Sequence, residues 1–326
     1  MKLNENGVRV VQDLIARADR LHVTIAAPPG DVCVIDCGVV ARGGLAAGCR
    51  LAEICLAGLA RVQLTRGHDA LWSGPWVAVM TDHPVSACMA AQYAGWPLSY
   101  GDYFAMGSGP MRAARGREPL FERIGCLEQP TRAVGVLESA WLPPAEVRSD
   151  IARQCQVEPE NLTLLVAPTA SLAGTVQVVA RSVETALHKL LELDFDLSRV
   201  ISGYGIAPLP PVAADNLTAI CRTNDAVLYG AHVTLWVRGD DSSLEAIGPR
   251  VPSASSRDHG RPFTDIFAAY DRDFYRIDPL LFSPAVIDFV NVETGRQFRY
   301  GEPQPRVLEA SFGVSQGNGI AGDAGE

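Results

Sequence analysis

Several common signatures of catalysis and nucleotide binding are missing from this sequence. It contains no GxxxxGK[ST] phosphate loop, no HExxH zinc motif and no G-x-S-x-G nucleophile elbow. The eight cysteines form no CxxC pair and the six histidines are spread out, so no metal site is predicted. These absences argue against phosphate-loop nucleotide hydrolases, zinc proteases and hydrolases of the serine-elbow type.

Positive charge is also scarce. The chain has 28 Lys and Arg against 37 Asp and Glu, a net charge of −9, which argues against binding to nucleic acid or to an anionic membrane. The uncharged stretch 162–180 contains Pro168, Ser171 and Gln177, and therefore does not read as a membrane span. The N-terminus lacks a basic-then-apolar signal pattern, and we expect a cytoplasmic protein with reduced thiols.

Hydrophobic residues are abundant, at 48% of 326, which is enough for one large or two medium domains. Predicted strands and helices alternate along the chain, so the sequence indicates an α/β or α+β fold. We predict an N-terminal α/β domain over 1–95 and a second α/β domain over 96–313. The boundary at residue 95 would change if the N-terminal domain were discontinuous, with part of it contributed by a later segment. Residues 314–326 lack periodicity, are rich in glycine and acid, and are predicted to be a disordered tail.

The most informative segment runs from Asn161 to Glu192. It reads as a buried strand over 162–167, a turn of small residues, and one long helix that begins after Ser171. Ser171 is a candidate N-cap, and Gly174 would allow another backbone or a ligand to approach closely. Arg181 and Glu184 are three residues apart and share one helix face. Periodicity alone leaves two interpretations of this pair, an ordinary surface salt bridge, which is the more common case, or an active-site base with its ion partner.

Three further segments suggest loops that contact a ligand. Residues 103–110, YFAMGSGP, combine aromatic residues with glycines that would admit a planar ligand or an anion, although a simple turn explains them as well. Residues 204–211 form a proline-rich corner that a structural bend explains. Thr223, Asn224 and Asp225 are expected to form a turn before a strand over 226–237, and that turn either caps itself or hydrogen-bonds a heterocycle.

Taken in order, many segments resemble one known family. The chain resembles methenyltetrahydromethanopterin cyclohydrolase from about Leu3 to Gly313, and it departs from the expected pattern at Cys221, where glycine is expected. No single motif is decisive, but the ordered set is specific. The segments are VIDCG (34–38), AGCRLAEICLAGLA (47–60), DHP (82–84), AGW (94–96), YFAMGSGP (103–110), LES (137–139), LVAPTASLAGTVQVVARSVETA (165–186), GIAPLPP (205–211), TNDAVLYG (223–230), DFYRIDPLLFSPA (273–285) and VLEASFG (307–313).

This resemblance implies a reaction and a site. It implies that water opens the methenyl bridge of 5,10-methenyl-tetrahydromethanopterin to the N-5-formyl form, in one-carbon metabolism. It also implies a two-domain fold with the carrier in a cleft between the domains, a homotrimer, and no metal or redox cofactor. By the resemblance, Glu184 is the base that activates water, and Arg181 positions and tunes it. Provisional contacts to the pterin carrier are Tyr103, Phe104, Met106, Ser108, Gly109, Thr169, Ser171, Asn224 and Asp225.

The chemistry fits this assignment. The methenyl group is an amidinium cation and is already electrophilic, so the site must supply a base for water and then an acid for the departing aryl amine. A carboxylate suited to both steps needs partial burial to bring its pKa near the working pH. We therefore expect the Arg181 and Glu184 pair to face a cleft, with Glu184 desolvated. Two alternatives remain, a non-catalytic protein that binds reduced pterins and a thiol-dependent enzyme that uses a cysteine.

Overall fold

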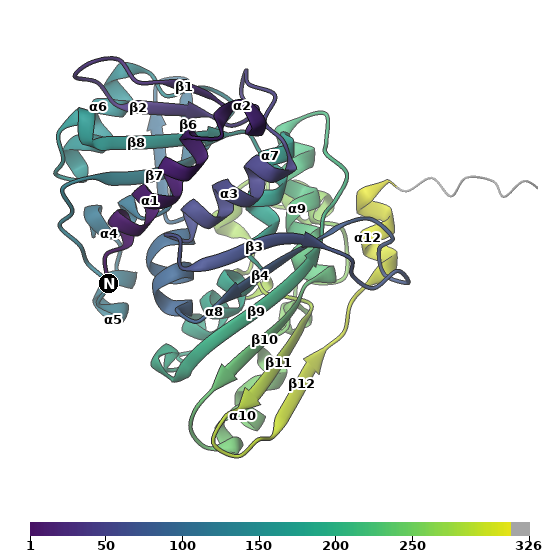
Figure 1. Cartoon of the computed structure of the whole chain (residues 1–326). Helices are drawn as coiled ribbons and strands as arrows, with labels where there is room; N and C mark the ends of the chain where they lie inside the picture. The colour runs from purple at the N-terminus through teal and green to yellow at the C-terminus, as the bar shows by residue number, and fades with distance from the viewer. Residues whose placement is uncertain (314–326) are drawn as a thin grey trace, which may run out of the picture.

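Two mixed sheets of six strands each form the framework of the molecule (Figure 1). The computed structural model describes residues 1–313, and the tail predicted at 314–326 lies outside them. The first sheet has the order β1-β2-β8-β7-β6-β5 and the second the order β12-β11-β10-β9-β4-β3. Helices cover both sheets, so the prediction of a mixed α/β fold is confirmed.

The first sheet has a parallel centre and antiparallel edges. Strands β2, β8 and β7 run parallel, whereas β1 pairs antiparallel with β2, and β6 and β5 continue antiparallel from β7. The carboxyl ends of the three parallel strands therefore meet at one edge. The strands are β1 (Thr24–Ala26), β2 (Cys33–Asp36), β5 (Trp96–Tyr100), β6 (Tyr103–Ser108), β7 (Ala133–Glu138) and β8 (Leu162–Ala167).

The second sheet is mostly antiparallel, with one parallel pair between β10 and β11. Strands β3 and β4 come from the N-terminal third of the chain, and the other four strands follow residue 199. They are β3 (Ala60–Thr65), β4 (Trp76–Thr81), β9 (Val200–Pro208), β10 (His232–Val237), β11 (Val286–Asn291) and β12 (Gln297–Gly301). The predicted division at residue 95 therefore separates strands that share a sheet. Sheet membership favours a discontinuous unit, while the domain boundaries themselves stay a prediction.

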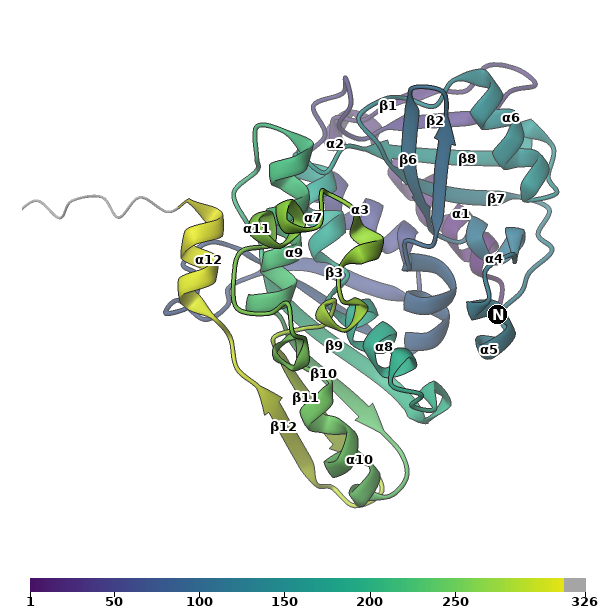
Figure 2. The ribbon, with the colours of Figure 1, turned by 180° about the vertical axis from the view of Figure 1, so that it is seen from behind.

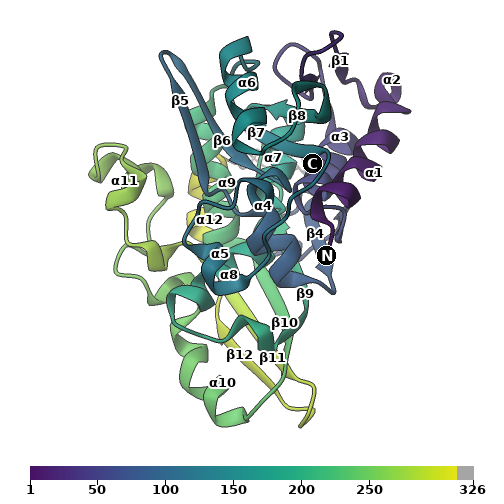
Figure 3. The same cartoon turned by 90° about the vertical axis from the view of Figure 1, so that its left-hand side faces the viewer.

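Helices fill the space between the sheets and cover their outer faces. Helices α3 and α7 lie between the two sheets, and Figure 3 shows α6 and α1 on opposite sides of the first sheet. Figure 2 shows α8, α9, α10 and α11 in front of the second sheet. The α-helices are α1 (Leu3–Ile15), α2 (Ala18–Leu21), α3 (Leu45–Cys55), α4 (Met111–Arg115), α5 (Leu120–Ile124), α6 (Ala145–Gln154), α7 (Leu172–Val179), α8 (Ser182–Glu192), α9 (Asn216–Gly230), α10 (Asp241–Ile247), α11 (Phe263–Ala269) and α12 (Pro305–Phe312).

Shorter helical turns complete the chain. One of them, η1 (Val85–Gln92), is a π-helix, a rare form that is frequent at functional sites. The other turns are 3₁₀-helices, η2 (Pro159–Asn161), η3 (Leu197–Arg199), η4 (Gly248–Arg250), η5 (Ser253–Ser255), η6 (Phe274–Arg276) and η7 (Pro279–Leu281). Within residues 1–313, no helix has the length and apolar character needed to cross a bilayer.

Two predicted loops are regular elements. Residues 103–108 form strand β6, because Tyr103, Ala105 and Gly107 alternate as buried positions against β5 and β7. Residues 223–225 do not form a turn before a strand. They lie inside helix α9, which begins after Asp215 and runs to Gly230, and only 232–237 of the predicted strand is extended. A short apolar run such as AVLYG fits a buried helix as well as a strand, which explains the error.

Candidate functional site

The predicted long helix is interrupted where the candidate site lies. Helix α7 begins after Ser171, whose hydroxyl accepts a hydrogen bond from the Gly174 amide at 3.0 Å, as predicted for an N-cap. A side chain at Gly174 would collide with the Pro168 carbonyl oxygen, so the predicted close approach is also present. Helix α7 ends at Val179, and α8 begins at Ser182 with Arg181 as its N-cap residue. The single-helix prediction is therefore wrong, and Glu184 occupies the first turn of α8.

Arg181 and Glu184 are buried. Their side chains are 10% and 6% exposed, and Arg181 Nη1 lies 3.8 Å from Glu184 Oε2. Arg181 Nη1 also donates to the Gln92 carbonyl oxygen at 2.8 Å, and Nη2 donates to Ser108 Oγ at 3.5 Å. An exposed pair contributes little and is mobile, whereas this one is fixed by contacts from two other elements. The interpretation as a surface salt bridge is wrong, and the expected desolvation of Glu184 is confirmed.

Burial governs the charge state of Glu184. Removal from water raises the pKa of the Glu184 carboxyl above its ordinary value, while the positive charges of Arg181, His188 and Arg112 oppose that rise. The start of α8 adds a partial positive charge that favours the carboxylate. A general base needs a pKa closer to the working pH than that of an exposed glutamate, and burial shifts the pKa of Glu184 in that direction.

The π-helix η1 shapes one wall of the site. It ends at Gln92. The Gln92 carbonyl oxygen accepts a hydrogen bond from Arg181, and Gln92 Nε2 donates to the Ala180 carbonyl oxygen at 3.0 Å. The Gln92 side-chain oxygen is buried and has no hydrogen-bond partner among residues 1–313. Because orphaned buried acceptors are rare, Gln92 Oε1 marks a position where a water or a ligand donor would be stabilised.

Arg112 holds this wall in place. It is fully buried, donates through Nε to Glu118 Oε1 at 3.0 Å, and donates through Nη1 to the Met89 carbonyl oxygen at 2.9 Å. Its guanidinium lies 5.0 Å from the centre of the Tyr93 ring. The Tyr93 ring stacks on His188 at 5.2 Å, and His188 follows Glu184 by one turn of α8. The sequence analysis missed Gln92, Arg112 and Tyr93, although polar residues inside the apolar runs ACMAAQY and GPMRAA were a usable signal.

The predicted contacts on 103–109 divide between two faces of strand β6. Phe104, Met106 and Ser108 alternate with Tyr103, so they face the opposite side of the sheet. Ser108 Oγ lies 3.2 Å from Cys55 Sγ and is the group that Arg181 contacts. Tyr103 instead packs with the buried residues of α6 on the far side. The structure thus brings Ser108 to the Arg181 and Glu184 pair, with Met106 and Phe104 along the same face, and does not bring Tyr103 there. Gly109 follows the strand with a φ of 89°.

The other predicted contact residues lie on the turn before α7 and on helix α9, at different distances from Arg181 and Glu184. The Thr169 hydroxyl donates to Glu138, and Ser171 is occupied as the N-cap of α7. The start of α9 touches this turn, since Asn216 Oδ1 accepts from the Ala170 amide at 3.0 Å. Asn224 and Asp225 lie eight or more residues farther along α9, about 12 Å away by helical rise. Within residues 1–313, Asn224 bonds to α9 itself, and Asp225 interacts with the start of α11 and with Ser311 of α12, so no contact brings either residue to Arg181.

Asp225 provides a test of stability. It is fully buried, and burial raises its pKa from 3.8 to about 7. The folded state thus holds a proton that the unfolded state releases, and stability falls as pH rises from about 4 to about 7. We expect Asp225→Asn to raise the free energy of unfolding by about 2–4 kcal/mol at pH 8 and by little at pH 4. Urea unfolding at both pH values checks this, and a gain that does not depend on pH would contradict it.

All eight cysteines are free thiols, and burial makes most of them unreactive. Burial raises the pKa of Cys55 and Cys88 beside the site, and it raises that of the half-buried Cys49 to about 11. A nucleophilic cysteine needs the opposite shift, so the structure gives the thiol-dependent alternative no support. We expect native protein treated with iodoacetamide at pH 7.5 to keep its activity. Rapid inactivation that bound substrate prevents would contradict this.

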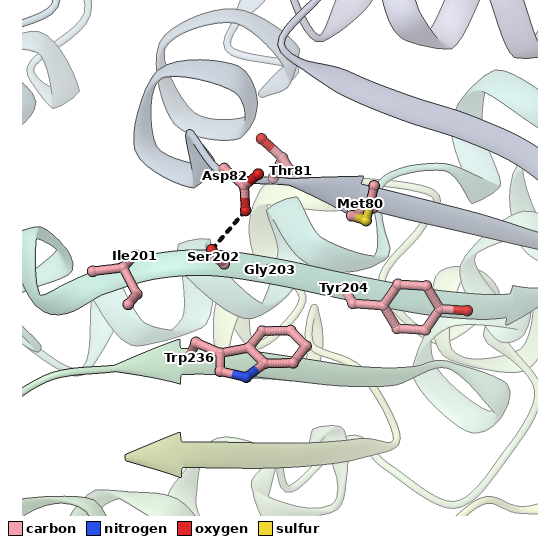
Figure 4. A pocket seen from close by; sticks show the side chains of 8 residues that line it. All are labelled: Met80, Thr81, Asp82, Ile201, Ser202, Gly203, Tyr204 and Trp236. Atoms are coloured by element: carbon pink, nitrogen blue, oxygen red, sulfur yellow. Dashed lines mark hydrogen bonds between the residues drawn. The ribbon is translucent and has the colours of Figure 1, made fainter. Parts of the chain in front are cut away.

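Two small hollows lie away from the pair. One, of about 280 Å³, is on the outer face of the second sheet, where Figure 4 shows Tyr204 and Trp236 side by side and Asp82 accepting a hydrogen bond from the Ser202 hydroxyl at 2.7 Å. The other adjoins the start of η1 around His83. Neither is lined by a residue that the sequence analysis assigned to the site.

Comparison with known proteins places the chain in context. A family model described as Cyclohydrolase (MCH) matches residues 2–312. The chain is 50% identical to the methenyltetrahydromethanopterin cyclohydrolase of Rhodopirellula baltica over 86% of each chain. It is 48% identical to that of Xanthobacter autotrophicus, over 93% of this chain and 90% of the relative. It is 38% identical to that of Methanococcoides burtonii, over 96% of this chain and 99% of the relative.

Proposed function

The chain belongs to the methenyltetrahydromethanopterin cyclohydrolase family and is a hydrolase of that kind, and we propose that its carboxylate Glu184 activates the water that opens the methenyl bridge. The substrate is the methenyl form of the reduced pterin carrier and the product is its N-5-formyl form. The observation that carries this proposal is the buried Glu184 carboxyl, 3.8 Å from Arg181 at the start of α8.

The proposed steps balance in atoms and charge. The Glu184 carboxylate takes a proton from water as the oxygen bonds to the methenyl carbon, which gives a neutral tetrahedral adduct. The protonated Glu184 then delivers that proton to the aryl-amine nitrogen as its bond to carbon breaks. Loss of the hydroxyl proton leaves the formyl group, and one proton is released overall. One carboxyl group thus serves as base and then as acid, which favours a pKa raised from its ordinary value toward the working pH.

Arg181 supports these steps as a positioning residue. Its guanidinium is held by the Gln92 carbonyl and the Ser108 hydroxyl, so its charge stays fixed beside Glu184. That charge limits the rise in the pKa of Glu184 caused by burial, and so favours the ionised carboxylate. We assign the attacking water to the space between Glu184 and the unpartnered Gln92 side-chain oxygen.

We place the carrier along the face of strand β6 that carries Phe104, Met106 and Ser108. Phe104 is 55% exposed and Met106 half-buried, and together they provide an apolar surface for a flat ring. Gly109, Thr169 and Ser171 are proposed to border this surface. Tyr103, Asn224 and Asp225 stay predictions from the sequence, without a contact that supports them.

The remaining features are proposed from the family resemblance and from chemistry. The amidinium carbon is electrophilic without a Lewis acid, so we propose a reaction without metal or redox cofactor. We also propose a homotrimer that works in the cytoplasm in one-carbon metabolism, a reducing setting that suits eight free cysteines. Light scattering of the purified protein tests the oligomeric state.

The proposed function is tested by following the methenyl carrier directly. The methenyl form absorbs in the near ultraviolet, and opening the bridge removes that band. We expect catalytic amounts of the protein to remove the band much faster than buffer alone. Stoichiometric binding with no loss of the band would instead indicate a pterin-binding protein without catalysis, and would overturn the proposal.

A further inference from the structure

A second carboxylate lies at the edge of the first sheet near the catalytic pair. Glu138 is the last residue of β7, and the parallel strands β2 and β8 end beside it. In open α/β sheets, ligands bind beyond the carboxyl ends of parallel strands, where neighbouring connections diverge. Here the chain leaves β7 toward α6 on one face and leaves β2 toward α3 on the other. Glu138 therefore occupies a position where a ligand is expected.

The neighbouring strand ends in a carboxylate with a different environment. Asp36, at the end of β2, accepts hydrogen bonds from the backbone amides of the four residues at 38–41, at 2.7 to 2.9 Å. Its role is therefore structural, because it organises its own loop. Glu138 is half-buried, and among the described residues its carboxylate accepts a hydrogen bond only from the Thr169 hydroxyl. Within residues 1–313, no Lys, Arg or His side chain forms an ion pair with it. A half-buried carboxylate without a cation retains unused acceptor capacity.

Glu138 shares a sheet face with the groups that contact the catalytic pair. It is directly opposite Met106 in the β6–β7 ladder, and Ser108 is opposite Val136. Side chains two residues apart point to the same face, so Met106, Ser108 and Glu138 lie on one side of the sheet. Glu138 is one two-residue step, about 7 Å, from the level of Ser108, which contacts Arg181. This separation is comparable to the span from the methenyl bridge across the fused pterin rings to their far edge.

We propose that Glu138 binds the amino-amide edge of the pterin ring and sets the position of the carrier, an inference that rests on the proposed function. That edge presents two parallel N–H donors, the 2-amino group and the ring amide. A carboxylate accepts such a pair in a bidentate arrangement, which is both strong and geometrically selective. The Thr169 hydroxyl orients the Glu138 carboxylate by donating a hydrogen bond to it, and Met106 lies beside Glu138 on the neighbouring strand. Glu138 is thus a residue that binds the far edge of the pterin ring system and does not touch the reacting methenyl carbon.

The test measures kcat and KM for the methenyl carrier in two variants of Glu138. Glu138→Gln is nearly isosteric but replaces one acceptor with a donor, and we expect KM to rise about 10- to 100-fold with kcat within about threefold. Glu138→Asp keeps the acceptors and should lose less affinity. Glu146→Gln, an exposed carboxylate of α6 on the opposite side of the sheet, is the control and should match the wild type. Thr169→Val should raise KM less than Glu138→Gln does.

The outcomes separate this inference from the proposed function. A wild type that does not open the methenyl bridge contradicts the proposed function. If the wild type is active and Glu138→Gln has an unchanged KM, only the role of Glu138 is overturned. A Glu138→Gln variant with a lower kcat and a lower melting temperature would also overturn that role, because it would indicate structural damage. Competition adds a chemical readout. The wild type should prefer pterin over lumazine, which has a carbonyl in place of the 2-amino group, and Glu138→Gln should lose that preference. A wild type without it would also overturn the assignment.

Discussion

Replacing Glu184 with Gln is expected to lower kcat about 10²- to 10⁴-fold while KM changes little. The amide keeps the shape of the side chain but cannot take a proton from water. Removing a buried acid from a desolvated position should leave the melting temperature unchanged or slightly higher, because the amide pays no penalty for ionisation. Loss of the near-ultraviolet band of the methenyl carrier measures the rate, and calorimetry measures the stability.

The matched control is Glu192→Gln on the same helix. Glu192 lies two turns beyond Glu184, and its side chain is 40% exposed. The substitution removes the same charge from α8 without touching the buried pair, so a rate equal to that of the wild type is expected. A Glu184→Gln enzyme with near-normal turnover would mean that another group activates the water.

Arg181 gives the second large effect. Arg181→Met removes the charge that opposes the burial of Glu184, so the pKa of Glu184 rises further and less carboxylate is present at neutral pH. We expect kcat/KM at pH 7 to fall about 10²-fold or more. The loss should shrink as pH increases, because ionised Glu184 is recovered. Measuring kcat/KM between pH 6 and 9 in the variant and the wild type tests both statements.

A lysine at position 181 separates charge from geometry. Arg181→Lys keeps the positive charge but not the fork that reaches the Gln92 carbonyl and Ser108. It should show a reduced rate with a pH dependence close to that of the wild type. Arg9→Met, at an exposed arginine of α1, is the control and should have no effect. A loss in Arg181→Met that is the same at every pH would show that Arg181 does not tune Glu184.

The sequence was most informative where local signals agreed with each other. Strand β8 begins and ends at the predicted residues, and Ser171 caps the next helix as expected. The alternation of strands and helices predicted the α/β class, because it follows from periodicity that is local to each element. The identity of Glu184 and Arg181 as candidates came from the family resemblance, since their spacing alone favoured a surface ion pair.

The rest depends on contacts between distant parts of the chain. Nothing local distinguishes strand β6 from a glycine-rich loop, because its extended form is set by pairing with β5 and β7. The break between α7 and α8 and the π-helix η1 are likewise settled by packing, in which Gln92 bonds to both Ala180 and Arg181. Burial of an arginine such as Arg112 requires a carboxylate and carbonyl oxygens brought from other elements, which no periodicity predicts.

The pH dependence of kcat/KM, compared between the wild type and the residual activity of Glu184→Gln, tests the central claim most directly. If Glu184 is the base, the wild-type rate rises with pH through one ionisation, at a pH above the ordinary range of a glutamate, because burial raises the pKa of Glu184. That ionisation should be absent from the residual rate of the variant. The same ionisation in both enzymes would contradict the account, because the titrating group would then be another residue or the carrier itself.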